Sequence, residues 1–345
     1  MDILTRLNEK TGYTTMQLQF ILGAWVMSKL GEGKSSKIKV DDGDVNEGDY
    51  NKGSIYSLLY SLYRSVGTVK SDTGEAYELT FNTWGYVWPP EWDTNPTTSA
   101  TDPQRFGKNA YTGLFQSSYV KDYVAKRDGK VHVVEMGCGT GAGAHHVCSK
   151  VLPKCTYESV DMQRAAIETC RRKFVPELGG RLVATHANAT KLDIKDGAAD
   201  IVAVCETHVT EHAGQCGDED QRFFQTMYRL LKPGGLFVWG NAIPDSTWKP
   251  CFEYLESIGM KKLEEHDVTA LAVQARDEDK GRVDAYCEQA IKRFYAFQLP
   301  VIGRARAREA RMAMENFYRN PGTNLYRNMV KETDTYRVVV FEKTA

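Results

Sequence analysis

Short apolar runs alternate with amphipathic segments from residue 130 to the end of the chain. Apolar runs of this kind predict strands, and apolar positions spaced three and four apart predict helices. Strands that alternate with helices are typical of a parallel sheet covered on both faces. We therefore expect a doubly wound α/β fold with a seven-stranded, mostly parallel, Rossmann-like sheet. The predicted strands are 131–136, 155–161, 181–187, 199–205, 235–241, 259–268 and 336–341.

The first part of the chain has a different pattern. Helical spacing of apolar residues over 14–30 and again over 54–66 predicts two amphipathic helices. Between them, 31–53 is rich in Gly, Asp, Lys and Ser and is interpreted as a linker or mobile loop. An aromatic, proline-broken segment follows at 81–92, and 105–126 is predicted to be helical.

Two more helices, 270–297 and 304–319, are predicted between the last two strands, where a minimal fold would have a short turn. An insertion of this length must cover something. The predicted division is an N-terminal helical and aromatic lid region, a cofactor-binding core, a helical insert over the acceptor pocket, and a final core strand. These units span 1–104, 105–268, 269–333 and 334–345.

Composition narrows the class of protein. The 345 residues, 42% of them hydrophobic, are enough for a full core. The net charge is −1 without a long basic block, which disfavours nucleic acid as a partner. The most apolar early run, 20–27, is far shorter than a membrane span needs, and the first residues lack a signal-peptide core. The cysteines show no CxxC or zinc-finger spacing. We expect a reduced, cytoplasmic protein without stable membrane insertion.

The main candidate site follows the first predicted core strand, in the sequence VHVVEMGCGTGAGAHH at 131–146. Glycines allow the sharp turn and the close approach of a ligand to the backbone. A bare GxGxxG would fit a nicotinamide enzyme as well, or serve only as a tight turn. The acid Glu135 before the first glycine makes E-M-G-C-G-T-G resemble motif I of the class I S-adenosylmethionine-dependent methyltransferases. That resemblance implies that Glu135 helps to hold the methionine end of the cofactor.

Further residues follow the next strands at the expected positions. Asp161 ends the second strand, where a carboxylate can accept both ribose hydroxyls, although it would fit NAD equally or act as an N-cap. Met162 can lie against adenine, and the resemblance implies that Asn188 faces the adenine amine. The sequence LKPGG at 231–235 is a family mark that dehydrogenases do not share. The predicted cofactor-binding residues are Glu135, Gly137, Cys138, Gly139, Asp161, Met162, Asn188, Ala189 and Cys205.

From about residue 56 to the end, the layout resembles the S-adenosylmethionine-dependent small-molecule methyltransferases. This group includes phthiotriol-type lipid and rebeccamycin-type sugar O-methyltransferases and, more distantly, tocopherol methyltransferases. The matching features are Trp84 and Tyr86 before the core, motif I, LKPGG, and a helical insert before a tyrosine-containing strand. Residues 1–50 lie outside the resemblance, and no motif is specific for one acceptor.

Acceptor chemistry is expected just after the fourth strand, in CETHVTEH at 205–212, because ligands of open α/β sheets bind outside the carboxyl ends of the strands. A histidine suits removal of a hydroxyl proton at neutral pH. Some sugar and lipid O-methyltransferases of this type carry one here, and His208 matches it best. The alternative is that His208 only caps or packs the loop. The predicted catalytic residues are His208, His212 and Glu206.

Aromatic side chains before and within the core could line an acceptor pocket and face a sulfonium by cation–π contact. The alternative is a packed loop and a helical core stripe. Arg319 or Tyr326, at the end of the insert, could reach the acceptor from above. The predicted acceptor-pocket residues are Trp84, Tyr86, Tyr111, Phe115, Thr207, Asp245 and Tyr326. Of the pair His145 and His146, one is expected to pack on the sheet and the other to face solvent.

The predicted function is methyl transfer from S-adenosylmethionine, with S-adenosylhomocysteine as product and no metal, to a small-molecule acceptor. O-methylation with a histidine base is favoured. S-methylation of a thioether, as in dimethylsulfoniopropionate synthesis, C- or N-methylation, and an inactive cofactor-binding subunit remain as alternatives. A homodimer is left open, and a nicotinamide oxidoreductase is disfavoured by EMGCGTG and LKPGG together.

Overall fold

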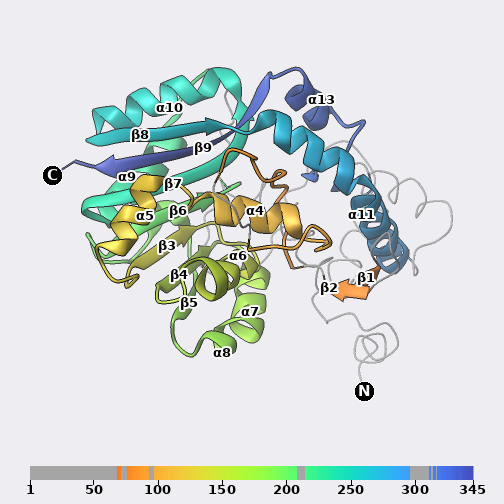
Figure 1. Ribbon diagram of the computed structural model, residues 1–345, viewed down its shortest axis with the longest axis horizontal. Helices are drawn as coiled ribbons and strands as arrows, with labels where there is room; N and C mark the ends of the chain where they lie inside the picture. The colour runs from red at the N-terminus through yellow and green to blue at the C-terminus, as the bar shows by residue number, and fades with distance from the viewer. Residues whose placement is uncertain are drawn as a thin grey trace, which may run out of the picture.

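A computed structural model describes residues 68–70, 76–78, 80–92, 97–207, 214–295, 311, 314–315 and 317–344. Its centre is a seven-stranded sheet with the order β5-β4-β3-β6-β7-β9-β8 (Figure 1). β9 is antiparallel to both of its neighbours, and the five strands from β5 to β7 pair in parallel. The strands are β3 (His132–Met136), β4 (Thr156–Asp161), β5 (Leu182–His186), β6 (Ala199–Cys205), β7 (Leu231–Pro244), β8 (Met260–Asp267) and β9 (Asp334–Lys343). The predicted fold class and all seven predicted strands are confirmed.

Each face of the sheet has its own hydrophobic core. On one face, α4 (Arg105–Gly113), α6 (Ala142–His146) and α7 (Arg164–Lys173) pack on alternate residues of the strands. On the other face, α9 (Asp218–Leu230) and α10 (Asp245–Ser257) pack on the intervening residues. Because successive side chains of a strand point to opposite faces, the continuous apolar runs of β3, β6 and β7 supply both cores.

The remaining elements are shorter or lie at the edges. They are α5 (Ser118–Ala125), a π-helical turn η2 (Val147–Val151), α8 (Val175–Leu178), a 3₁₀ turn η3 (Ala189–Lys191), α11 (Thr269–Tyr295) and α13 (Asn324–Val330). A small antiparallel hairpin, which the sequence pattern did not predict, pairs β1 (Thr68–Lys70) with β2 (Ala76–Glu78). Among the described residues, no helix is both long and apolar enough to cross a bilayer.

Three differences from the predicted elements have local causes. The single helix predicted over 105–126 is two helices, because α4 ends at Gly113 and the Ser117 side chain caps α5 by accepting from the Tyr119 N–H at 3.2 Å. α13 was not predicted, and it begins where Thr323 caps the Tyr326 N–H. The KPGG turn lies within β7, as an irregularity in its pairing with β6. The predicted helices over 14–30 and 54–66, the linker 31–53 and most of 304–319 lie outside the described residues.

α11 and α13 lie between β8 and β9 in the chain, and α11 crosses the end of the sheet at which the parallel strands finish (Figure 1). The Val87 N–H donates to the Leu271 carbonyl of α11 at 3.1 Å, which joins this helix to the segment 80–92. The insert therefore covers the carboxyl edge of the sheet, where a ligand of this fold is expected.

The second core gives a direct test of this packing. Leu255 on α10 is fully buried, so Leu255→Ala removes apolar contacts and leaves a cavity. We expect the free energy of unfolding, measured by urea denaturation, to fall by about 2–5 kcal/mol. Lys249 lies on the same helix with its side chain 85% exposed, and Lys249→Ala should change the value by no more than about 0.5 kcal/mol. Equal effects of the two substitutions would contradict the assignment of α10 to the core.

Candidate active site

The glycine loop connects β3 to α6 at the carboxyl edge of the sheet. The backbone N–H groups of Gly137 and Cys138 both donate to the Val160 carbonyl of β4, at 2.7 and 3.0 Å. Gly137 has a φ of +87°, and a Cβ there would lie 2.0 Å from Cγ2 of Thr207. The Thr207 hydroxyl also donates to the Gly137 carbonyl at 2.8 Å. Glycine is therefore required at this position both by its backbone conformation and by the close approach of the loop after β6.

Asp161 holds the middle of the same loop. One carboxylate oxygen accepts from the Gly139 N–H at 2.8 Å and the other from the Gln163 N–H at 2.7 Å. Burial raises the pKa of Asp161 to about 6, against these two donors, which lower it. An ionised carboxylate oxygen can accept more than one hydrogen bond, so both oxygens retain capacity for ligand hydroxyls. The loop and Asp161 thus fit the ribose of S-adenosylmethionine.

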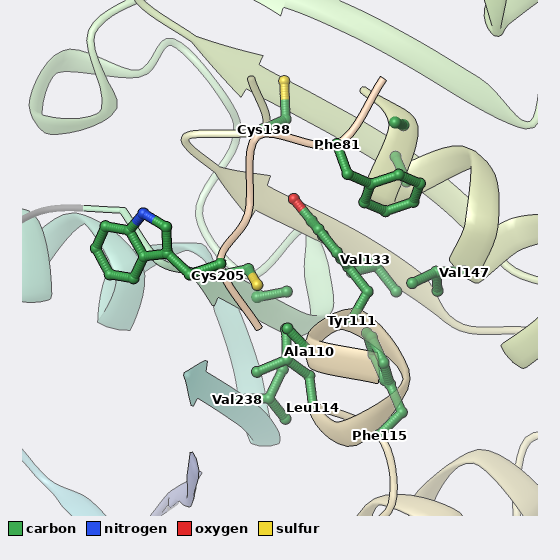
Figure 2. Packing of buried hydrophobic residues seen from close by; sticks show 14 of the residues in the cluster. Phe81, Ala110, Tyr111, Leu114, Phe115, Val133, Cys138, Val147, Cys205 and Val238 are labelled. Atoms are coloured by element: carbon green, nitrogen blue, oxygen red, sulfur yellow. The ribbon is translucent and has the colours of Figure 1, made fainter. Parts of the chain in front are cut away.

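Glu135 is fully buried at the end of β3 and is held by two tyrosines. The Tyr111 hydroxyl donates to one oxygen at 2.8 Å and the Tyr157 hydroxyl to the other at 3.1 Å. Figure 2 shows Tyr111 extending from α4, and its ring is edge-to-face with Phe81 at 5.9 Å between centroids. Burial raises the pKa of Glu135 to about 7, although both tyrosine hydrogen bonds oppose the shift. Tyr111, predicted for the acceptor pocket, therefore contacts the acid of the cofactor loop, and Tyr157 was not identified from the sequence.

Glu206, at the end of β6, joins the core to the aromatic segment before it. Its two carboxylate oxygens accept from the backbone N–H groups of Trp84 and Gly85, at 2.6 and 2.7 Å. The Tyr336 hydroxyl of β9 donates to it at 2.8 Å. Glu206 has a φ of +50°, and burial raises its pKa while these three donors lower it. Of the predicted catalytic residues, Glu206 is the one that the structure describes, and its donors identify it as a clamp on residues 84–85.

Aromatic rings pack beside residues 84–85, which Glu206 holds. Tyr86 is fully buried, with its ring edge-to-face against Tyr336 at 5.3 Å and Trp92 at 5.9 Å between centroids. The indole N–H of Trp84 donates to the Phe317 carbonyl at 2.6 Å. Tyr336 was not among the predicted pocket residues, and its place at the start of the last apolar run was the available signal. The structure thus brings Trp84 and Tyr86 together with a strand about 250 residues away in the chain.

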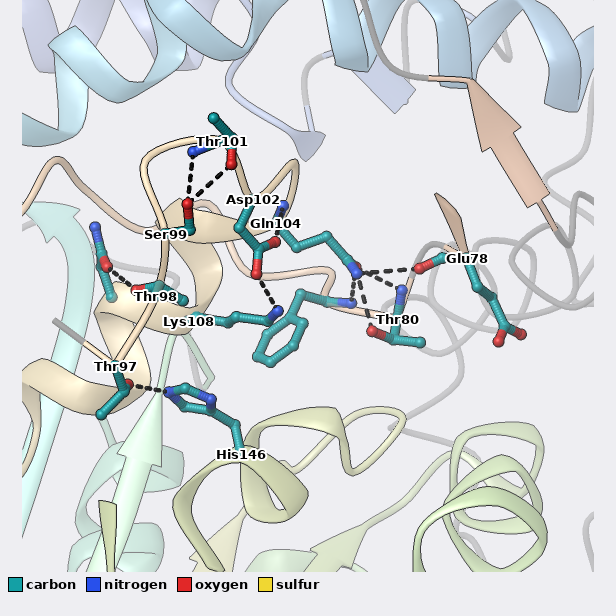
Figure 3. Close-up of polar contacts among 12 residues, drawn as sticks. Glu78, Thr80, Thr97, Thr98, Ser99, Thr101, Asp102, Gln104, Lys108 and His146 are labelled. Carbon is teal, nitrogen blue, oxygen red and sulfur yellow. Dashed lines mark hydrogen bonds and ion pairs between the residues drawn. The ribbon is translucent and has the colours of Figure 1, made fainter. Parts of the chain in front are cut away.

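A second set of contacts anchors the start of this segment (Figure 3). The Gln104 side-chain oxygen accepts from the Thr80 and Phe81 N–H groups at 2.7 and 2.9 Å. His146 is buried and bonds to Thr97 at 3.0 Å, and burial lowers its pKa to about 4. Nε2 of His145 instead lies 2.8 Å from a carboxylate oxygen of Glu177 at the surface. One histidine of the pair is therefore packed and the other partly exposed.

The structure also describes most of the remaining predicted site residues. The Tyr326 hydroxyl donates to Asp277 of α11 at 2.7 Å, on an exposed surface. Asp245 pairs with Arg337 at 2.6 Å. Phe115 belongs to the buried core, and Cys205 is buried at the end of β6. Asn188 caps η3 by accepting from the Thr190 N–H at 2.9 Å, and Met162 and Ala189 are partly buried beside β5. His208 and His212 lie outside the described residues.

Comparisons with known proteins agree with this geometry. Residues 133–235 match the family model of a methyltransferase domain. A probable phthiotriol/phenolphthiotriol dimycocerosates methyltransferase 2 of Mycobacterium ulcerans (strain Agy99) is 26% identical over 59% of this chain and 71% of its own length. A phthiotriol/phenolphthiotriol dimycocerosates methyltransferase of Mycobacterium tuberculosis (strain ATCC 25177 / H37Ra) is 25% identical over 56% of this chain, and the match spans 64% of that protein.

Two solved structures share the fold. A putative sarcosine dimethylglycine methyltransferase from Galdieria sulphuraria has a TM-score of 0.54 and 10% identity, over 84% of this chain and 98% of its own. The [4+2]-cyclase SpnF has a TM-score of 0.52 and 18% identity, over 85% and 95%. At these identities the likeness concerns the fold alone. The family match over residues 133–235, the relatives above, the strand order and the glycine loop together support a class I S-adenosylmethionine-dependent small-molecule methyltransferase.

The raised pKa of Glu135 predicts a pH effect on the cofactor-free enzyme. An unfolded glutamate ionises near pH 4.5, and the folded one ionises at about 7. Between these values the folded state holds the extra proton, so the free energy of unfolding should fall as pH rises, by about 3 kcal/mol from this group. Asp161 adds to the same slope, because its pKa is also raised.

Glu135→Gln should flatten the dependence between pH 5 and 8, measured by urea denaturation at each pH. Glu253 on α10 is exposed, so Glu253→Gln should keep the wild-type slope. A Glu135→Gln curve parallel to the wild type would show that this carboxyl does not titrate in that range.

Proposed function

We propose that the enzyme methylates a hydroxyl of a small-molecule acceptor and that His208 is the general base. The contact between Thr207 and the glycine loop is the observation that carries this proposal. His208 is the next residue after Thr207. Consecutive Cα atoms are about 3.8 Å apart, so the His208 Cα is one residue away from the contact between Thr207 and the glycine loop. The curated relatives support a hydroxyl acceptor, because phthiotriol is a triol by name.

The hydrogen bonds that Glu206 already accepts also favour a histidine as the general base. Methyl transfer to oxygen requires loss of the hydroxyl proton, by a base within hydrogen-bonding reach. The Glu206 carboxylate is engaged by Trp84, Gly85 and Tyr336. Deprotonation of Tyr336 is opposed, because burial and Glu206 raise its pKa well above the ordinary value. A histidine following Thr207 in the chain, His208, would supply the base that these groups do not.

The remaining residues would bind and orient the reactants. When bound, S-adenosylmethionine supplies a methyl group activated by its sulfonium. Asp161 and the loop at 137–141 would hold the ribose and the methionine end. Glu135, which is itself held by two tyrosine hydroxyls, would help to hold the methionine end. The segment 80–92 and α11 would exclude water from the acceptor side. The rate of methyl transfer would then be gained mainly from the orientation of the two reactants.

Methylation of a thioether is the second candidate. Its product is a sulfonium, and the edge-to-face group of Tyr86, Tyr336 and Trp92, together with Trp84, would suit a cation. This reaction moves no proton and needs no base. The two candidates therefore differ in their dependence on His208 and on pH.

Asp161→Ala tests the cofactor assignment. The change removes the acceptor of the ribose hydroxyls and of the Gly139 N–H, so affinity for S-adenosylhomocysteine should fall by about 1–3 kcal/mol, measured by calorimetry. Asp122 is exposed on α5, and Asp122→Ala should leave the affinity unchanged. Binding of NADH by the wild type without any response to S-adenosylhomocysteine would overturn the assignment.

His208→Ala tests the acceptor chemistry. With a hydroxyl acceptor, turnover should fall about 10²–10⁴-fold with nearly unchanged cofactor affinity, and the wild-type rate should fall as pH drops through roughly 6.5. A screen of hydroxyl and thioether metabolites for methyl transfer supplies the assay substrate. With a thioether, pH dependence should be weak, and Trp84→Leu should reduce turnover more than His208→Ala. A flat pH profile with a nearly active His208→Ala enzyme would exclude the hydroxyl proposal.

A further inference from the structure

Three charged residues lie on the inward face of α11. Arg276, Asp279 and Arg282 are 1%, 3% and 8% exposed, at spacings of three residues that place them on one side of the helix. Apolar positions such as Ala272 and Val283 continue the same buried stripe. Burial of charge is unfavourable unless each charge is paired, so the partners of these residues decide whether they are structural.

The hydrogen bonding of the Arg276 guanidinium is incomplete. Both oxygens of Asp279 accept from Arg282, at 2.6 and 2.5 Å. Nη1 of Arg276 lies 3.5 Å from the same Asp279 carboxylate. Nη2 donates to the Trp84 carbonyl. Nε and Nη1 have no hydrogen-bond partner within the part of the chain that the structure describes.

A second buried guanidinium lies on the ring of Trp84. Arg319 is 3% exposed, and its central carbon is 4.4 Å from the centroid of that ring. Nη1 pairs with Asp334 at 3.0 Å, and Nη2 donates to the Ala242 carbonyl at the end of β7, at 2.9 Å. Its Nε also has no hydrogen-bond partner among the described residues. The backbone of Arg319 has a φ of +49°, so a strained conformation places this side chain.

Both guanidiniums lie at the acceptor side of the site. Each contacts Trp84, whose backbone N–H is bound by Glu206, and the charge of Glu206 acts on both. Glu206 does not complete either arginine, because its oxygens already accept from Trp84, Gly85 and Tyr336. Buried donors without partners are rare in native proteins and often mark a site for a ligand.

We propose that Arg276, together with Nε of Arg319, binds a carboxylate of the acceptor. This inference rests on the proposed methyl transfer and adds the chemical class of the acceptor: a small hydroxy acid or thioether acid. A carboxylate has two oxygens, so it can accept from a different arginine N–H group on each oxygen, whereas a hydroxyl offers one oxygen only. Both oxygens of Asp279 accept from Arg282, and Asp334 pairs with Arg319, whereas Arg276 only approaches Asp279 at 3.5 Å, so a ligand carboxylate would complete the hydrogen bonding of Arg276.

The test uses the full-length enzyme loaded with S-adenosylhomocysteine. The probes are ω-hydroxy and ω-methylthio carboxylates of three to six carbons and their matched primary amides, with affinity measured by calorimetry. The best carboxylate should bind about 10- to 100-fold more tightly than its amide, because hydrogen bonds to a charged group are the stronger ones. Arg276→Met should remove that difference, and Arg276→Lys should restore part of it. Equal affinity of acid and amide for the wild type, or binding of none of the carboxylates, would overturn the proposal.

Two controls separate this inference from the proposed function and from misfolding. Arg172 is exposed on α7, so Arg172→Met should keep the carboxylate preference. Affinity for S-adenosylhomocysteine should change less than about twofold in Arg276→Met. If that variant does not fold, the acid–amide comparison on the wild type still decides the question. Carboxylate binding without methyl transfer from S-adenosylmethionine to any hydroxy acid would contradict only the O-methylation proposal. Equal methyl transfer to acids and amides would contradict only the carboxylate site.

Discussion

The carboxylate of Glu206 connects three parts of the chain that are remote in sequence. It receives backbone N–H groups from residues 84 and 85, 122 and 121 positions earlier, and the hydroxyl of Tyr336, 130 positions later. Its own N–H donates to the Gly240 carbonyl of β7 at 2.7 Å. The end of β6 therefore fixes the aromatic segment and the last strand relative to the cofactor loop. Glu206 therefore joins Trp84 and Gly85 to Tyr336 of β9.

The position of the acid explains why so much polarity is buried beside it. A carboxylate removed from water needs donors, and here backbone and tyrosine donors supply them. Arg276 and Arg319 add positive charge on the other side of Trp84. Glu135 repeats the arrangement one strand away, with two tyrosines as donors. Both acids lie at the carboxyl ends of neighbouring strands, so this edge of the sheet carries two buried acids beside the glycine loop.

Local patterns were sufficient to predict the sheet and the cofactor loop. The strands β3 to β9 extend over five or more residues each, and Asp161 binds the backbone of the glycine loop at Gly139. The acceptor side could not be predicted in this way. The contact of Tyr111 with Glu135 and that of Arg276 with Trp84 depend on packing between distant segments, and the charged stripe of α11 has the spacing of an ordinary solvated face. Glu206 was identified as a site residue, but its role as a clamp follows only from the fold.

The claim that Glu206 holds the segment 80–92 on the core can be tested at two backbone amides, those of Trp84 and Gly85. In Glu206→Gln, the side chain keeps one acceptor oxygen and gains a donor, so at least one of the Trp84 and Gly85 N–H groups loses its partner. Hydrogen exchange should become about 10- to 100-fold faster at these two amides. The Phe81 amide, which is held by Gln104, should exchange at the wild-type rate. Unchanged exchange at both residues 84 and 85 would contradict the account.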